Sequence, residues 1–383
     1  MTSMAEHEAF TAWSEEHGVE INGIAPAKLP GRGLGMVAQR PIKKGEILVS
    51  VPAKLLVTTA SPLVRKYKLP SHCAPHGQLA AALTLSHDEL DEGQKIWRAT
   101  WPTRDDFQTT PLLWSAELQA LLPEHAKQLL QKQKEKYRKD MGNLDNVIPQ
   151  PKREVFLYYW LLVNSRCFYW VIPSPKRRRG PRPPKLAPDD CMALCPFADY
   201  FNHADHGCDF ATNARKGWIT CDRDYNEGEE VYVSYGNHNN DMLLAEYGFI
   251  LEQNCWDEVM LDEAIMPRLS ASQKELLEEY GFLGNYVLDN DQICHRSQAV
   301  LRVLLQPKGK SVRFLRGDDD GESEQGLVDE LRVKVLREYK STIEKRLETI
   351  MGMDGESMSQ RVILTDRWKQ ILGLLEKRCV SGG

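Results

Sequence analysis

The chain has 383 residues, 42% of them hydrophobic and 27% charged, and its 49 Lys and Arg against 54 Asp and Glu give a net charge of −5. This composition is typical of a soluble globular protein of two or three domains whose core needs no disulfide or metal. The negative charge argues against a nucleic-acid-binding protein. The longest apolar run, residues 155–163, is about half of what a membrane-spanning helix needs.

The amino terminus and the cysteines favour a reducing compartment. Residues 1–8 contain neither a basic start nor an apolar stretch, so we expect no secretory signal. An odd count of nine cysteines without tight pairing is typical of free thiols. We therefore expect a cytoplasmic or nuclear protein without a membrane segment.

Helical and strand patterns alternate along the chain. Apolar spacing predicts a helix over residues 5–17 that ends at Gly18, and then short strands in the ranges 19–24, 34–38 and 47–51. Helical periodicity returns between about residues 60 and 172. Strands are expected again in the ranges 208–212, 218–221 and 230–233, each bounded by turn residues. After Tyr247 the pattern is helical, with an apolar face that we expect to include Leu327 and Val335.

The segment 173–188 holds six prolines and six basic residues, and we expect a loop there. A nuclear import signal is one interpretation of this run, and a charged surface loop is the alternative.

The glycine-rich sequence of residues 31–35 is open to two interpretations. Glycines let a backbone approach a ligand, but they also form plain turns. A Rossmann-type nucleotide site would need a buried strand before the glycines and an acidic residue about 20 positions later, and both are missing here. A doubly wound cofactor domain is therefore excluded.

Residues 199–203, Asp-Tyr-Phe-Asn-His, place polar groups inside an apolar stretch, where burial without partners is costly. The side chains either hold a ligand or satisfy one another in a buried turn. Six nearby Cys and His residues do not show the paired spacing of zinc ligands, so we expect no metal; these are Cys191, Cys195, His203, His206, Cys208 and Cys221.

Two tyrosines follow. Alternation over residues 229–236 predicts a strand that carries Tyr235 at its end, and Tyr247-Gly248-Phe249 comes twelve residues later. Tyrosines in a narrow site would supply an apolar wall, a face that attracts cations and an orienting hydroxyl. The alternative is that both are core aromatics.

In chain order, these motifs resemble those of SET-domain protein methyltransferases. The motifs are the glycine loop, Val51-Pro52, residues 164–168, the Asp199 to His203 segment, Tyr235-Gly236 and Tyr247-Gly248-Phe249. The branch most similar is typified by the plant Rubisco large-subunit lysine methyltransferase. The resemblance implies an α+β fold: a SET-domain β core with a pseudoknot at residues 19–250, a large helical insert at about 60–190, and an all-helical substrate-binding lobe at 251–383.

The resemblance also implies roles for individual residues. Tyr235 would be the catalytic tyrosine. S-adenosyl-L-methionine would be the cofactor, held by Arg32, Gly33, Leu34, Gly35, Arg166, Asp199, Asn202 and His203. The lysine channel would be formed by Phe168, Tyr235, Tyr247 and Phe249. The residues after His203 and after Gly236 depart from the family's usual pattern without removing a catalytic group.

The implied activity is protein-lysine N-methylation of a cytosolic or nuclear protein, such as a ribosomal protein or a translation factor, by a monomer that binds no nucleic acid. Desolvation and the cofactor's positive charge would lower the lysine pKa from about 10.4, so no catalytic base is required. Two alternatives stay open: a protein-histidine methyltransferase of the same fold, and a non-catalytic SET-like binding module.

Overall fold

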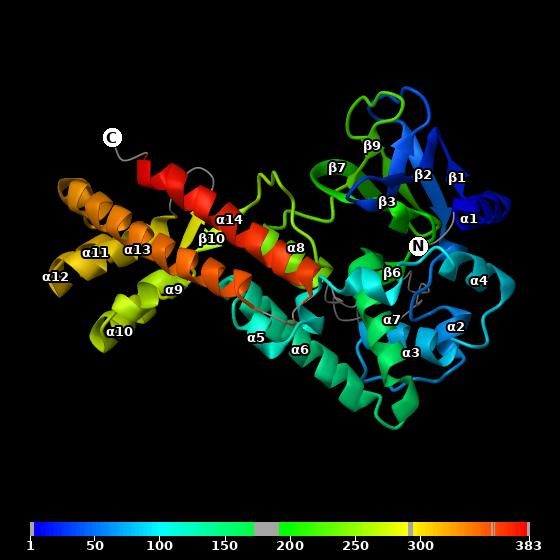
Figure 1. Cartoon of the computed structure of the whole chain (residues 1–383), viewed down its shortest axis with the longest axis horizontal. Coiled ribbons are helices and arrows are strands. Elements are labelled where there is room, and N and C mark those ends of the chain that lie inside the picture. The colour runs from blue at the N-terminus through cyan, green and yellow to red at the C-terminus, as the bar shows by residue number, and fades with distance from the viewer. Residues whose placement is uncertain (1–3, 172–190, 290–293, 354, 356, 381–383) are drawn as a thin grey trace, which may run out of the picture. The chain divides into compact units, whose positions relative to one another are not determined.

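The computed structural model describes residues 4–171, 191–289, 294–353, 355 and 357–380. The chain divides into two units (Figure 1). Unit 1 comprises Met1–Phe107 and Lys132–Asn237, and unit 2 comprises Gln108–Gln131 and His238–Gly383. The basic segment 173–188, predicted as a loop, lies outside the described residues.

Unit 1 contains the β core, which is made of short antiparallel strands. Its strands are β1 (Glu20–Ile21), β2 (Ile24–Leu29), β3 (Gly33–Ala38), β4 (Ile47–Pro52), β5 (Cys167–Tyr169), β6 (Met192–Leu194), β7 (His203–Thr212), β8 (Lys216–Thr220) and β9 (Glu230–Val231). They form a four-stranded sheet in the order β1-β4-β8-β7, a three-stranded sheet β2-β3-β9 and the pair β5-β6. The predicted strands are confirmed, except that the stretch 19–24 divides into β1 and the start of β2, and that the last predicted strand is shorter than expected.

Unit 1 also contains helices. The helices of unit 1 are α1 (Met4–Glu16), α2 (Pro62–Arg65), α3 (Pro75–Leu85), α4 (Glu92–Arg98), α7 (Arg153–Arg166) and the second part of α6 (Glu124–Asn143). The side chains of Asp91 and Gln94 form a capping box that fixes the start of α4. Phe10 of α1 stacks on Trp97 of α4 with 6.2 Å between ring centroids, and α3 packs against α7.

Two segments far apart in the sequence meet beside the sheets. Val233 N–H donates to the Asn202 carbonyl oxygen over 3.0 Å, and Cys208 N–H donates to the Tyr232 carbonyl oxygen over 2.8 Å. Residues 202–208 therefore contact the chain on both sides of Val233, as the predicted pseudoknot requires. A Cβ atom at Gly207 would lie 2.9 Å from the backbone of Ser234, so only glycine allows this approach.

This contact also corrects one predicted strand. The pattern of residues 229–236 predicts a strand that reaches Tyr235, but β9 ends at Val231. The backbone groups beyond it bond to residues 202 and 208 instead of continuing the sheet. Tyr235 is consequently positioned by the crossing of two segments and not by a strand end.

Unit 2 is mainly helical. Its helices are α5 (Ala116–Gln119), the first part of α6, α8 (Asn240–Tyr247), α9 (Asp262–Ile265), α10 (Ala271–Glu279), α11 (His295–Leu305), α12 (Lys308–Arg316), α13 (Gln325–Met351) and α14 (Met358–Val380). The two long helices α13 and α14 pack against each other (Figure 1). The lobe is not all-helical, because β10 (Glu258–Met260) pairs with β11 (Val287–Asp289). This pairing buries Val259 and Leu288 in the core of the unit.

A buried ion cluster ties α14 to the rest of unit 2. The Arg367 guanidinium, with no exposed side-chain surface, donates to Asp241 and to Asp257 over 2.7 Å each. Asp241 lies on α8, so the charged group joins two helices far apart in sequence. Across the described residues, each helix is too short or too polar to span a lipid bilayer.

Candidate active site

The centre of the candidate site is the contact between His203 and Tyr235 in unit 1. Tyr235 N–H donates to His203 Nδ1 over 3.0 Å, and the two rings stack with centroids 4.9 Å apart at 24°. The Tyr235 hydroxyl donates to the Phe201 carbonyl oxygen over 2.7 Å. Both ends of the tyrosine are thus held by the segment that carries Asn202 and His203.

These bonds define the protonation of both side chains. Burial raises the pKa of Tyr235 to about 12, so its hydroxyl is protonated at neutral pH. The hydroxyl hydrogen is directed to Phe201, so the oxygen acts as an acceptor toward other groups. Because His203 Nδ1 accepts a hydrogen bond, the neutral ring carries its proton on Nε2.

Arg166 ends α7 and reaches the same segment. Its Nη1 donates to the Asp199 carbonyl oxygen over 2.6 Å, while the Asp199 carboxylate accepts from the Trp97 indole over 3.3 Å. Burial raises the pKa of Asp199 to about 6, against the opposing effect of the Arg166 charge. The Asp199 side chain therefore faces α4, and its backbone positions Arg166.

The glycine loop forms the turn between β2 and β3, with positive φ angles of 71° at Gly31 and 75° at Gly33. The Leu34 carbonyl oxygen accepts from Asn202 Nδ2 over 3.0 Å. A Cβ atom at Gly35 would lie 2.7 Å from the same amide nitrogen. The structure thus places the loop directly against Asn202. The role of the loop in cofactor binding stays a prediction.

Glu230 is a site residue that the sequence analysis missed. Its carboxylate accepts from Asn202 Nδ2 over 2.8 Å and from the Tyr232 hydroxyl over 2.7 Å. Arg32, whose side chain is 59% exposed, also bonds to Glu230 over 3.1 Å and contacts the Tyr232 hydroxyl. Strand alternation is the one sequence signal that could have identified Glu230, because it predicts that Glu230 and Tyr232 share a face.

The four residues assigned to a lysine channel come from both units. Phe168 and Tyr235 belong to unit 1, where the Phe168 ring packs on Phe210 with centroids 4.4 Å apart. Tyr247 and Phe249 belong to unit 2, where their rings lie 6.0 Å apart at the end of α8. A shared channel of all four aromatics therefore stays a prediction.

Two of the cysteines considered for zinc come together with a carboxylate. Cys208 and Cys221 lie at the paired ends of β7 and β8, and their sulfur atoms and an Asp222 oxygen are all within 4.8 Å of one another. The Cys208 thiol and the Tyr225 hydroxyl both donate to Asp222 Oδ1, over 3.2 and 2.8 Å. Burial raises the pKa of both thiols. The Cys208 thiol is thus hydrogen-bonded within the core, and the expectation of no metal stays a prediction.

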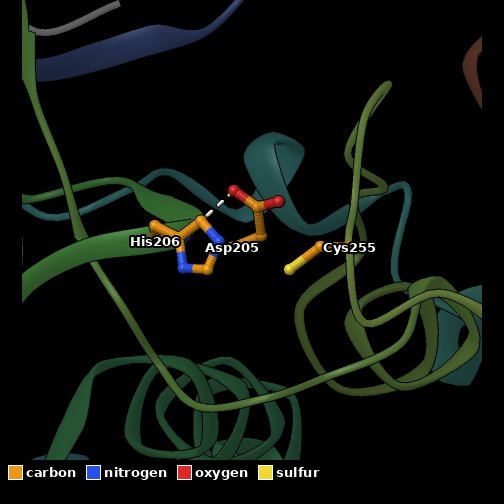
Figure 2. Close-up of side chains that lie close together, drawn as sticks. All are labelled: Asp205, His206 and Cys255. Carbon is orange, nitrogen blue, oxygen red and sulfur yellow. Dashed lines mark hydrogen bonds between the residues drawn. The ribbon is translucent and has the colours of Figure 1, made fainter.

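The two residues after Ala204 depart from the family's usual pattern. Figure 2 shows that the Asp205 carboxylate accepts from the backbone N–H of His206, over 2.9 Å. The third side chain labelled there, Cys255, belongs to unit 2. The Asp205 bond lies within β7, which begins at His203.

Comparisons with known families agree with this arrangement. A family model described as the SET domain matches residues 33–236, and one described as the ribosomal lysine N-methyltransferase 2 C-terminal domain matches residues 257–379. The first covers more than half of the chain and includes the strands from β3 to β9, the helical insert and Tyr235.

Three relatives illustrate the range of named proteins that the chain is similar to. SET domain-containing protein 4 of Mus musculus is 27% identical, with 76% of this chain and 71% of the relative covered. Ribosomal lysine N-methyltransferase set11 of Schizosaccharomyces pombe is 24% identical, with 93% of each covered. Actin-histidine N-methyltransferase of Drosophila melanogaster is 25% identical, with 80% and 58% covered.

Solved structures show the same fold. The SET domain of LSMT bound to lysine and AdoHcy matches with a TM-score of 0.58 at 17% identity, covering 100% of this chain and 93% of that one. Rubisco LSMT bound to AdoMet matches with a TM-score of 0.58 at 18% identity, covering 98% and 93%. The fold expectation, a SET core followed by a helical region, is confirmed.

Proposed function

Because this chain belongs to the SET-domain family, we propose that it is an S-adenosylmethionine-dependent protein-lysine N-methyltransferase. The observation that carries the proposal is the hydrogen bond and ring stacking between His203 and Tyr235. They place a neutral tyrosine hydroxyl beside the Asn202-His203 segment. Similarity to ribosomal lysine N-methyltransferases over most of the chain supports a protein substrate, such as a ribosomal protein or a translation factor.

The polar atoms of unit 1 fit the proposed cofactor. Arg166 Nε is buried and, among the described residues, has no hydrogen-bond partner, so it can serve an anionic group such as the cofactor's carboxylate. The turn at Gly31 and Gly33 leaves space beside the backbone, since a Cβ atom there would meet nothing within 4 Å. Asn202 bonds to the loop at the Leu34 carbonyl oxygen, and Arg166 bonds to the backbone of Asp199, three residues before Asn202.

When bound, S-adenosylmethionine supplies an electrophilic methyl group on a positively charged sulfur. The protein's own contribution is orientation and exclusion of water. The Tyr235 oxygen, acting as an acceptor, would orient the amine for attack, and good alignment of reacting groups is worth about 7–11 kcal/mol in favourable cases. An aromatic, desolvated site next to a cationic ligand lowers the pKa of the entering lysine and delivers it neutral.

Labelled methyl transfer tests the proposal. The purified chain is incubated with methyl-labelled S-adenosylmethionine and a cytosolic extract, beside the Tyr235→Phe variant. We expect a labelled protein band that is lost or strongly reduced in the variant. Equal labelling by both proteins would overturn the role of Tyr235. Failure of the wild-type chain to bind the cofactor would overturn the methyltransferase proposal and favour a non-catalytic binding module.

A histidine acceptor is the second candidate. Similarity to actin-histidine N-methyltransferases of three species supports it. Histidine is already largely neutral at pH 7, so a histidine site would not need to lower the pKa of its acceptor. The labelled residue of the product peptide distinguishes the two acceptors.

A further inference from the structure

We propose that Glu230 is a positioning residue for cofactor binding: its carboxylate fixes the Asn202 amide so that the amide oxygen faces the ligand. The inference rests on the proposed function, because the ligand concerned carries an ammonium group. It concerns a residue that the sequence motifs do not include, and it follows from the hydrogen bonds around Asn202.

The amide of Asn202 uses its hydrogens on two protein acceptors. Nδ2 donates to the Leu34 carbonyl oxygen over 3.0 Å and to Glu230 Oε1 over 2.8 Å. Both partners are acceptors only, so the nitrogen must face them and the amide cannot be reversed. The side chain therefore offers the ligand an acceptor, Oδ1, and no donor.

Glu230 is itself held firmly. Its backbone lies in β9, paired with Val37 of β3, and its side chain is only 10% exposed. The Tyr232 hydroxyl and the Arg32 guanidinium bond to the carboxylate oxygen that Asn202 does not use. The charge of Arg32 lies beside that of Glu230 and compensates the carboxylate for its small exposure to water.

The glycine loop contacts both Asn202 and Glu230 at Gly35. A Cβ atom at Gly35 would lie 2.7 Å from Asn202 Nδ2 and 2.8 Å from Glu230 Oε1. The absence of a side chain at this position lets the amide and the carboxylate meet directly against β3. Three separate segments, β3, the residues before β7, and β9, thus define a single orientation of one amide.

This orientation selects for a ligand that donates hydrogen bonds. An ammonium group, as in S-adenosylmethionine and S-adenosylhomocysteine, can donate to Oδ1, whereas a reversed amide would present its N–H groups to the positive charge. Without Glu230 the Leu34 carbonyl oxygen is left as the single acceptor of the two, so the orientation of the amide is held less firmly. Loss of Glu230 should therefore weaken binding of ligands that carry the amino acid portion, and leave binding of the adenosine portion unchanged.

The experiment compares two ligands by titration calorimetry: S-adenosylhomocysteine, and 5′-methylthioadenosine, which lacks the amino acid portion. In Glu230→Ala we expect the Kd for S-adenosylhomocysteine to rise at least about tenfold, as for the loss of one well-oriented bond to a charged group. The Kd for 5′-methylthioadenosine should change less than about twofold, since it makes no use of Asn202. Glu230→Gln keeps one acceptor oxygen and should show a smaller rise.

Glu229→Ala is the matched control. Glu229 is the adjacent acid, bonds to Arg223 and Asn226 instead, and should leave both Kd values unchanged. A second test uses the Asn202→Ala background, in which Glu230→Ala should add no further loss, because the amide it positions is gone.

The outcomes are distinguishable. If the wild-type chain does not bind S-adenosylhomocysteine, the proposed function and this inference both fail. If the wild-type chain binds it and Glu230→Ala binds it equally well, or loses both ligands to the same extent, the positioning role is wrong while the proposed function stands. Additive losses in the Asn202→Ala background would also overturn the positioning role.

Discussion

Tyr235 and His203 are joined twice, by the hydrogen bond from Tyr235 N–H to His203 Nδ1 over 3.0 Å and by ring stacking at 4.9 Å. His203 follows Asn202 directly, so a shift of the proposed cofactor segment would carry the proposed catalytic tyrosine with it. The residues proposed for the cofactor and for the acceptor are consequently connected by one direct contact. This coupling suits an in-line methyl transfer, in which small errors of alignment are costly.

Tyr235→Phe should lower kcat by about 10- to 100-fold, the effect of losing one hydrogen bond of about 1–3 kcal/mol in the transition state. Cofactor affinity should change little, because the ring and the backbone bond to His203 are kept. Steady-state kinetics together with calorimetry with S-adenosylhomocysteine checks this. A variant with unchanged kcat would contradict the catalytic assignment.

Asp199→Asn should alter the pH dependence of stability. Burial raises the pKa of Asp199 to about 6 in the folded chain, against about 3.9 when unfolded. Between these pH values the folded chain binds a proton that the unfolded chain does not, so stability falls as the pH rises from about 4 to about 6.

The asparagine variant lacks this titration, so wild-type stability should decline relative to the variant across that interval. Urea unfolding of both proteins at several pH values between about 4 and 7 measures the difference. A difference that stays constant or moves in the opposite direction would show that folding does not raise the pKa of Asp199.

Gly207→Ala should destabilise unit 1 by about 1–3 kcal/mol, the usual cost of forcing extra atoms into a packed region. The new Cβ atom would meet the backbone at Val233 and Ser234 within 2.9 Å, and a backbone cannot move aside as a side chain can. Urea denaturation gives the change in free energy of unfolding.

Gly142→Ala is the control for this substitution. Gly142 lies near the end of α6 with nothing within 4 Å of a Cβ atom, so alanine should be neutral or slightly stabilising there. Equal effects of the two substitutions would argue against the crossing of residues 202–208 with the chain at Val233.

Arg367→Lys should destabilise unit 2 by about 3–5 kcal/mol, the cost of breaking a buried ion cluster. The planar guanidinium donates to Asp241 and Asp257 at once, and a lysine ammonium cannot reproduce both geometries. Denaturant unfolding measures the loss. Lys369→Ala, which removes an exposed lysine of the same helix, should stay within about 0.5 kcal/mol of the wild type.

Local patterns predicted most of the elements, because their causes are local. Glycine and proline bounded the short strands β3, β4 and β8, and apolar spacing located the helices α1 and α13. The prediction of the buried face was less accurate where two apolar residues are adjacent in the sequence. Leu327 was placed on the buried face of α13, yet it is 57% exposed while the neighbouring Val328 is buried. The strands β10 and β11 were missed because three residues are too few to show alternation.

The candidate site could not be derived from local patterns. Asn202 and Glu230 lie 28 positions apart in sequence, and Tyr235 and His203 lie 32 apart. Propensity and periodicity carry no information about which distant segments cross, so the meeting of Asn202-His203 with Tyr235 came only from the family resemblance. Glu230 belongs to no motif used there, and the structure alone reveals its bond to Asn202.

The measurement that tests the central claim most directly is mass spectrometry of a peptide from the protein that the purified chain labels with S-adenosylmethionine. The account predicts one or more methyl groups on a lysine side chain, made by the wild-type chain and made in strongly reduced amount by Tyr235→Phe. Methylation of a histidine would contradict the lysine assignment. If the chain binds the cofactor but yields no methylated peptide from any extract, the assignment as an enzyme is contradicted.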